Sequence, residues 1–356
     1  MLLLEATAWV WLAYFATHEQ QAFYAAPIGQ GGSFLGHTPL YQPHHWLVYT
    51  LRPNYRSLSS RVRHNSYGFR GPEFSVEKPL GMYRIVALGG STTYGIPITD
   101  DAKTYPARLE GHLKARYPGL RIEVINAGVG GYTSAENLIN LVFKVLDLTP
   151  DLLIIYHAHN DVHPRRQPEF AGDYTGYRKV WCPSPLARDV LFGWSALARI
   201  AGIRLGIWQP ESIYKYTTTL TEQRPKGEEY MENFRRSSSR YFRRNLRAMV
   251  AIAKGAGIEV LLPTAAYFPA AEPAGPYREV YERATNEHNQ VGREVAAETG
   301  VEVFDFGVVM PAERRYFTDS VHLTEEGADL QGRLFADRII ELGYIDQWAR
   351  KSSQRR

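Results

Sequence analysis

The hydrophobic pattern of the chain alternates between two kinds of stretch. Short runs are apolar at nearly every position, and longer stretches between them have apolar residues every three or four positions. A run that is apolar throughout predicts a strand buried on both faces of a sheet. Five such strands are expected, at residues 84–88, 122–126, 152–156, 258–262 and 301–304.

The longer stretches have the spacing of amphipathic helices. Apolar residues would share one helical face at 138–145, 242–253 and 280–295, and a further helical pattern covers 105–117. Strands that alternate with such helices predict an α/β fold with a parallel sheet covered on both sides. Right-handed crossovers would bring all the strand-to-helix loops to one edge of that sheet.

Two regions interrupt this alternation. Residues 20–80 lack long periodic segments and predict an extended leader that packs on the body, with Arg70 in a turn where it could meet an anion. Residues 162–240 predict an insertion between the third and fourth strands, with a small helical lid at 191–205. Its aromatic residues would line a substrate pocket or form a local core. The body is expected over 81–345, followed by a solvated basic tail at 346–356.

The first 19 residues leave two interpretations open. Leu2 to Thr17 is nearly all apolar but short for a membrane span, and it contains Glu5. The first basic residue is Arg52, so the basic start of a signal peptide is missing. The segment is either an interfacial or truncated membrane helix, which its aromatic residues favour, or a helix packed on the protein body.

Composition and charge narrow the function classes. The chain has 356 residues, enough for one large core or two modest domains. Its 41 basic and 37 acidic residues give a net charge of +4, too balanced to indicate a nucleic-acid partner. Cys182 is the single cysteine, so no internal disulfide can form.

The first candidate for chemistry is Ser91. It follows the strand at 84–88 and two glycines, which allow a sharp turn with nothing bulky beside the hydroxyl. The turn places Ser91 at the carboxyl end of a strand, where open α/β sheets bind ligands. Taken alone, the same pattern also fits a phosphate-binding helix start or a capped turn. No basic residue lies between Gly89 and Gly95, which argues against the phosphate site.

Three further loops place polar groups at the same sheet edge. After the second strand, glycines precede a capping box at Thr133 and Glu136, which predicts a helix start with backbone N–H groups facing a ligand. Asn160 follows the third strand and offers an amide donor. Asp319 stands three residues before His322, and this spacing lets the carboxylate hold the imidazole with Nε2 free. A nucleophile, a base with its orienting group, and donors for an oxyanion are the parts of acyl transfer.

Together these loops resemble the four sequence blocks of the SGNH (GDSL-like) hydrolases. The matching segments, within about Tyr83 to Leu342 and apart from the insertion, are Gly89-Gly90-Ser91, Asn126 to Gly131, His159-Asn160-Asp161 and Asp319-x-x-His322. The resemblance implies a three-layer α/β/α sandwich with a five-stranded parallel, flavodoxin-like sheet. It also implies a serine esterase that needs no cofactor and acts on an O-acyl or O-acetyl group of a carbohydrate or lipid.

The resemblance assigns roles residue by residue. Ser91 would be the nucleophile, His322 the general base and Asp319 its orienting carboxylate. The N–H groups of Ser91 and Gly131 and the amide of Asn160 would form the oxyanion hole.

The chain departs from the family pattern at two positions. Gly90 stands where the family usually has Asp, and His157 stands where it usually has Gly. The second change would narrow or polarise the pocket. The leader followed by Gly-Gly-Ser-Thr is also similar to a bacterial subgroup that often carries an N-terminal membrane helix. That similarity favours the cell envelope, membrane-anchored or periplasmic, as the location.

Several alternatives stay open from sequence. The same site would serve an O-acyltransferase, and a non-catalytic carbohydrate-binding relative is a further interpretation. His157, His159 and His163 with Asp161 could form a metal cluster, although their spacing matches no common zinc site. The basic run from Arg235 to Arg247 fits a solvated face or a membrane-surface contact.

Overall fold

The computed structural model of the chain describes residues 2–17, 20, 24, 40–57, 60–168, 170–174, 177, 194–207 and 228–354. The chain divides into two compact units, one made of residues 1–68 and 176–223 and the other of 69–175 and 224–356. Residues 69–80 therefore belong to the unit that holds the sheet. The domain boundaries expected from composition stay a prediction.

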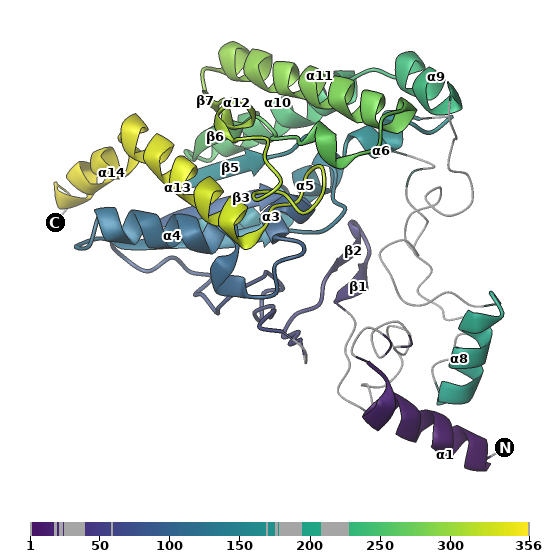
Figure 1. Ribbon diagram of the computed structural model, residues 1–356. Helices are drawn as coiled ribbons and strands as arrows, with labels where there is room; N and C mark the ends of the chain where they lie inside the picture. The colour runs from purple at the N-terminus through teal and green to yellow at the C-terminus, as the bar shows by residue number, and fades with distance from the viewer. Residues whose placement is uncertain are drawn as a thin grey trace. The chain divides into compact units, whose positions relative to one another are not determined.

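The second unit is built on a five-stranded parallel sheet (Figure 1). Its strands run in the order β4-β3-β5-β6-β7, which is the flavodoxin-like order. This arrangement confirms the predicted α/β fold and sheet. The strands are β3 (Met82–Gly89), β4 (Arg121–Gly128), β5 (Leu152–Tyr156), β6 (Glu259–Pro263) and β7 (Glu302–Phe304).

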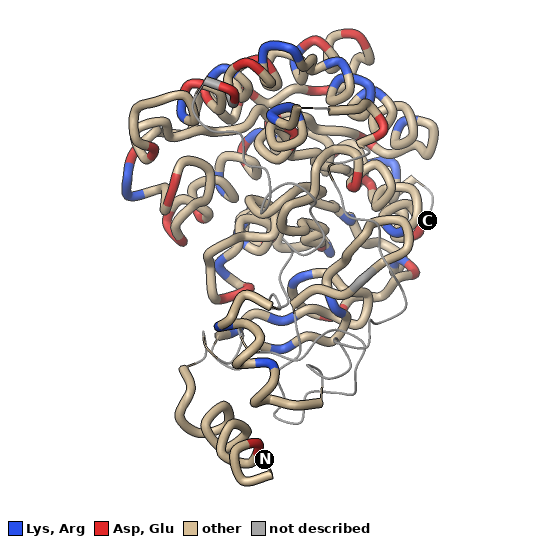
Figure 2. Tube along the Cα trace, turned by 90° about the vertical axis from the view of Figure 1, so that its right-hand side faces the viewer, with Lys and Arg blue, Asp and Glu red and all other residues tan. Residues whose placement is uncertain are grey.

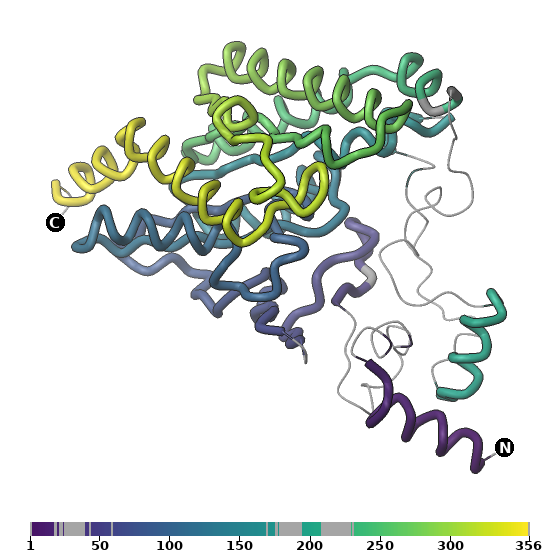
Figure 3. The backbone as a smooth tube through the Cα atoms, in the orientation of Figure 1, coloured from purple at the N-terminus to yellow at the C-terminus, as the bar shows by residue number. Residues whose placement is uncertain are grey.

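Helices cover both faces of this sheet (Figure 1). One face carries α4 (Tyr105–Arg116) and α13 (Glu325–Leu342); the other carries α5 (Ser134–Asn140), α10 (Arg240–Gly255) and α11 (Pro276–Thr299). In Figure 3, α4 and α13 lie side by side although more than 200 residues separate them. The remaining helices of the unit are α3 (Ser91–Tyr94), α6 (Val162–Arg165), α9 (Glu228–Arg236), α12 (Phe306–Val309) and α14 (Tyr344–Ser353), with single turns at Asp101–Lys103, Leu141–Val145, Leu146–Leu148 and Pro269–Ala271.

The strands are buried on both sides because successive side chains point to opposite faces. In β3, Ile85 and Ala87 belong to the core that includes Leu109 of α4 and Phe335 of α13. Val86 between them is also fully buried, so this strand supplies both layers. Continuous burial explains why the strand is visible in the sequence as an unbroken apolar run.

Charged residues are frequent along α10 and α11, and the upper part of Figure 2 shows such helices. Arg243 of α10 forms ion pairs with Glu294 and Glu298 of α11, and Arg247 also pairs with Glu298. These two arginines of the basic run from Arg235 to Arg247 thus have acidic partners on α11, which fits the interpretation of the run as a solvated face.

The first unit contains the N-terminal helix α1 (Leu2–Val10), which continues as a wider turn at Trp11–Phe15, and the helix α8 (Ala196–Arg204). Ala8 and Leu12 are buried against Ala196. In the described part of the chain, no helix has the length and apolar character needed to cross a membrane. The choice between the two interpretations of residues 1–19 stays a prediction.

Glu5 fixes the contact between these two helices. Its carboxylate accepts hydrogen bonds from Ser195 Oγ at 2.7 Å and from the backbone N–H groups of Ala196 and Leu197, at 2.6 and 3.2 Å. An acidic side chain at a helix N-terminus satisfies N–H groups that have no partner inside the helix. The single acidic residue in the N-terminal helix thus has a structural role.

The unit also holds a hairpin of β1 (Tyr41–His44) and β2 (Val48–Leu51). The helix predicted at 191–205 corresponds to α8, and it packs on the N-terminal helix within this unit. The predicted lid positions Leu191 and Phe192, and also Cys182, lie outside the described residues.

Candidate active site

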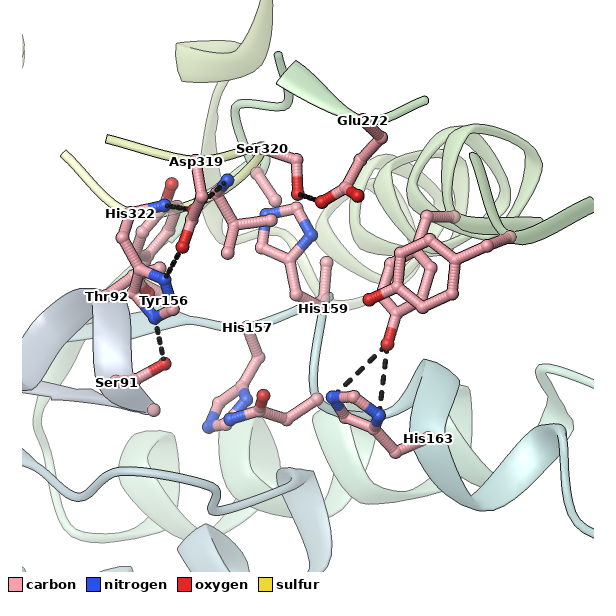
Figure 4. Close-up of a pocket in the computed structure, with 17 residues that line it drawn as sticks. Ser91, Thr92, Tyr156, His157, His159, His163, Glu272, Asp319, Ser320 and His322 are labelled. Atoms are coloured by element: carbon pink, nitrogen blue, oxygen red, sulfur yellow. Dashed lines mark hydrogen bonds and ion pairs between the residues drawn. The ribbon is translucent and has the colours of Figure 1, made fainter. Parts of the chain in front are cut away.

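The carboxyl ends of β3 and β5 and the loop before α13 meet at a pocket of about 210 Å³ (Figure 4). This is the edge of the sheet at which the sequence placed the polar loops. Ser91, Asn160, Asp319 and His322 line it, and all belong to the second unit. Gly131, the remaining site residue expected from the sequence, is not among the described residues that line the pocket.

Ser91 stands at a sharp change of direction. β3 ends at Gly89, Gly90 precedes the short helix α3, and Ser91 is the first residue of that helix. A Cβ atom at position 90 would lie 2.5 Å from Asn160 Nδ2, closer than side chains tolerate. Glycine at this position therefore lets the Asn160 amide approach the backbone beside the serine.

His322 lies within hydrogen-bond reach of that serine. Its Nε2 atom is 2.8 Å from Ser91 Oγ, across 231 positions of the sequence (Figure 4). On the other side of the ring, Nδ1 is 2.7 Å from Asp319 Oδ2. A hydrogen-bonded line runs from carboxylate to imidazole to hydroxyl. Its geometry allows the histidine to take the proton of the serine hydroxyl.

The loop around Asp319 is ordered by its own carboxylate. Asp319 Oδ1 accepts from the backbone N–H groups of Val321 and His322, at 2.8 and 2.7 Å. Partial burial alone would raise the pKa of Asp319, but the hydrogen bonds and charge of His322, with the Val321 N–H, lower it to about 2. The carboxylate is thus ionised at neutral pH and holds the proton on His322 Nδ1.

Asn160 directs its amide toward the same place. Its Nδ2 atom donates to Tyr132 O at 2.9 Å, which uses one of the two amide hydrogens. Gly131 precedes Tyr132 in a left-handed conformation with a φ of 78°, which glycine adopts readily. The hydrogen bond therefore joins the loop after β5 to the turn after β4, the two segments expected to supply oxyanion donors.

Asp161 strengthens this connection between the loop after β5 and the segment after β4. Its carboxylate accepts from the backbone N–H of Ser134 at 2.9 Å, from Ser134 Oγ and from Tyr174 OH. Asn245 of α10 donates to the same Ser134 Oγ at 2.9 Å. Burial raises the pKa of Asp161 to about 7, although the bonds from Ser134 oppose the rise. The residue after Asn160 is thus tied to the start of α5.

Arg70 has a structural position. Its guanidinium is buried, pairs with Asp101 at 2.7 Å, and donates to the carbonyl oxygens of Tyr94, Gly95 and Ile98. These contacts hold the loop that follows α3. The possible anion partner expected from the sequence is an internal carboxylate.

The histidines after β5 make separate contacts. His157 Nε2 accepts from Asn137 Nδ2, His159 Nε2 lies 3.0 Å from Ala266 O, and His163 bonds to Tyr281 OH at 3.0 Å. Burial lowers the pKa of His157 and of His159 to about 4, so both rings are neutral near pH 7. Within the described residues, no group of three or more His, Cys, Asp or Glu side chains is arranged to hold a metal ion.

Helix α11 adds an aromatic wall to the pocket that was not predicted from the sequence. Tyr277 and Tyr281 line the pocket with ring centroids 4.7 Å apart, and Tyr281 contacts His163. Glu272 and Ser320 add a polar contact of 2.7 Å at the rim. The signal in the sequence was the i, i+4 spacing of two tyrosines near a helix start. That spacing shows a shared helix face but not what the face meets.

The family comparison identifies the class of protein. The model of the GDSL-like lipase/acylhydrolase family matches residues 87–330, and the chain belongs to that family. The protein is an ester hydrolase of the SGNH fold class, as the sequence analysis predicted. A search of curated proteins finds no match.

The chain is similar to several solved structures that are distant from it in sequence. A lipase/acylhydrolase from Enterococcus faecalis is 19% identical, with 72% of this chain and 95% of that chain covered and a TM-score of 0.45. Axe2, an acetylxylan esterase from Geobacillus stearothermophilus, is 19% identical, with coverage of 72% and 94% and a TM-score of 0.44. LAE5, an alpha/beta hydrolase enzyme from the metagenome of Lake Arreo, Spain, is 17% identical, with coverage of 73% and 96% and a TM-score of 0.44.

Proposed function

We propose that this protein is a serine esterase that removes an O-acyl or O-acetyl group through an acyl-enzyme intermediate. The observation that carries the proposal is the hydrogen-bonded line from Asp319 through His322 to Ser91 Oγ, with both distances below 3 Å. It lies in the pocket at the carboxyl edge of the sheet, in a chain that belongs to an acylhydrolase family.

In the first half-reaction, Ser91 Oγ forms a bond to the acyl carbon while its proton passes to His322 Nε2. The ester C–O bond then breaks, and His322 returns the proton to the departing alcohol oxygen. Asp319 stays ionised and stabilises the imidazolium that exists between these steps. Water repeats the sequence on the acyl-enzyme, releasing the carboxylic acid and free Ser91.

The oxyanion that develops on the carbonyl oxygen needs fixed donors. The N–H of Ser91 opens helix α3 and has no acceptor within that helix. The second amide hydrogen of Asn160 and the N–H of Gly131 complete the proposed set. The bond from Asn160 to Tyr132 O supports this assignment because it holds the amide in one orientation.

The pocket favours a carbohydrate as the alcohol part of the ester. Tyr277 and Tyr281 offer aromatic faces with polar tips, which suit a ligand that alternates C–H surface with hydroxyls. His163, Glu272 and Ser320 add polar groups at the same wall. A lipid alcohol would displace water from this polar wall and offer no hydrogen bonds in return, at a cost in binding.

The proposal is tested by hydrolysis of p-nitrophenyl acetate and of an acetylated oligosaccharide. Ser91→Ala should lower kcat by several orders of magnitude with the fold retained. Ser353→Ala, a serine on α14 away from the pocket, is the matched control and should hydrolyse at the wild-type rate. Equal turnover by wild type and Ser91→Ala would show that another group is the nucleophile. Acyl transfer to an added sugar faster than hydrolysis would identify an O-acyltransferase that uses the same site.

A further inference from the structure

A second void lies directly behind the pocket. It measures about 10 Å³, room for about one water molecule. One side of its lining is apolar and comes from β5, β6 and α10, through Ile155, Leu262, Phe242 and Leu246. The other side carries the polar residues Thr264, His288 and Asn289. In its present size this void is too small for an acyl chain.

His157 separates the two spaces. It lines the pocket beside Ser91 and also lines the void behind it. It shares a strand face with Ile155, because alternate residues of a strand point the same way. Its side chain is only 2% exposed, so the ring fills the space between pocket and void.

The ring is held in this position from one edge. Asn137 Nδ2 donates to His157 Nε2 and to Gly89 O, the latter at 3.0 Å. Since Nε2 accepts, the neutral ring carries its proton on Nδ1, which faces Asp161 Oδ2 at 3.7 Å. Through Asn137, the His157 ring is thus anchored to Gly89 at the end of β3, two residues before Ser91.

The direction of the substrate follows from the chemistry of the proposed function, on which this inference rests. The alcohol oxygen receives its proton from His322 Nε2, so the alcohol leaves on the His322 side of Ser91. The acyl group then extends to the other side, toward the end of β5. In Figure 4, His322 lies above Ser91 and His157 lies at a lower level beside it.

We propose that His157 sets the acyl-chain length of the substrate: its ring closes the pocket against the void and restricts the acyl group to short chains. Replacing the ring with a small side chain would join the two spaces and let an acyl chain reach the apolar side of the void, formed by Ile155, Phe242, Leu246 and Leu262. Each methylene that such a channel buries improves kcat/KM by about fourfold, from a transfer free energy of about 0.8 kcal/mol.

The test compares p-nitrophenyl acetate, butyrate, hexanoate and octanoate with wild type, His157→Ala and His157→Gln. For wild type and His157→Gln, which keeps the volume and a hydrogen-bonding end, kcat/KM should fall at least tenfold from acetate to hexanoate. His157→Ala should reduce that ratio at least tenfold, mainly through a lower KM for the longer esters. Labelling of Ser91 with a fluorophosphonate counts the competent sites in each preparation.

Loss of the Asn137 contact can reduce folding, so His157→Val serves as a milder second variant with the same expected direction. A folded Ala or Val variant that keeps the wild-type chain-length profile would overturn the inference while leaving the esterase intact. Wild-type preference for octanoate over acetate would do the same. Absence of both turnover and Ser91 labelling in the wild type would instead overturn the proposed function, and the inference with it.

Discussion

Two aspartates lie at the site, and their surroundings differ. The side chain of Asp319 is 49% exposed, in the loop before α13, and its partners are within three residues in sequence. The side chain of Asp161 is 1% exposed, and its partners Ser134 and Tyr174 lie 27 and 13 residues away. The pKa of Asp319 is lowered to about 2, whereas that of Asp161 is raised to about 7.

The contrast between Asp319 and Asp161 shows two roles that an aspartate can have, one in the proposed reaction and one in holding segments together. Asp319 is stabilised as an anion by an imidazole that it orients, so its charge acts on the proposed reaction. Asp161 is buried with hydroxyl and amide donors, so burial opposes its charge and its oxygens mainly connect segments. The following substitutions test whether the two carboxylates are as different as their surroundings indicate.

The largest effect is expected for Asp319→Asn. The amide cannot stabilise the imidazolium and favours the other tautomer of His322, so kcat should fall by about 10⁴-fold. Steady-state hydrolysis of p-nitrophenyl acetate measures this. Asp161→Asn is the matched control, with an expected loss of no more than about tenfold. Equal losses of kcat in the two variants would show that Asp161 matters as much to the reaction as Asp319 does.

Asn160→Ala comes next. Asn160 adjoins Asp161, and removal of one oxyanion donor should lower kcat by about 10²–10³-fold with little change in KM. Asn160→Asp keeps the size but replaces the donor with an acceptor and should be at least as slow. An unchanged kcat for the Ala variant would exclude Asn160 from the oxyanion hole.

Asp161→Asn should mainly affect stability. Replacing an acceptor of three buried hydrogen bonds should cost about 1–3 kcal/mol in the free energy of unfolding, measured with urea. Because the folded pKa of Asp161 is raised from 3.8 to about 7, the native state binds more protons than the unfolded state between these values. The stability from this group is present below about pH 4 and is lost as pH rises through about 7.

The difference in stability between wild type and Asp161→Asn should therefore shrink as pH rises from 5 to 8. Buried histidines away from Asp161 contribute equally to both proteins, and burial lowers the pKa of His157, which faces Asp161, to about 4, below the pH range compared. A difference that grows over the same range would mean that Asp161 behaves like Asp319, with a lowered pKa.

The smallest effect is expected for Glu5→Ala. This third carboxylate caps α8 and is not among the described residues that line the pocket, so it provides a reference for purely structural loss. Burial would raise the pKa of Glu5, but the bonds from Ser195, Ala196 and Leu197 lower it. Loss of the cap should cost about 1 kcal/mol, detectable by chemical denaturation, with ester hydrolysis unchanged. A slower reaction would show that the cap supports more than its own unit.

The sequence predicted best what depends on local pattern. The strand expected at 84–88 is found at Met82–Gly89, because burial on both faces makes the whole run apolar. The contact between Asp319 and His322 could also be predicted, since a spacing of three residues allows the two side chains to meet within one turn of chain.

Contacts between segments that are far apart in the sequence could not be predicted from local patterns. Asn245 reaches Ser134 across 111 residues, and helical periodicity shows only that it lies near a buried face. The tyrosines of α11 were invisible as pocket residues for the same reason. His157 was noted only as a departure from a family pattern. Its place between two spaces depends on β6 and α10, which come at least 80 residues later.

The bond between Glu5 and Ser195 has a consequence for synthesis of the chain. Its two ends are 190 residues apart, and translation adds about 5–20 residues per second. The N-terminal helix therefore spends roughly 10–40 s after its own synthesis before the ribosome makes its partner. During that interval the face that Ala8 and Leu12 later bury is uncovered, so this helix reaches its native contacts only after a much later segment of the chain has been made.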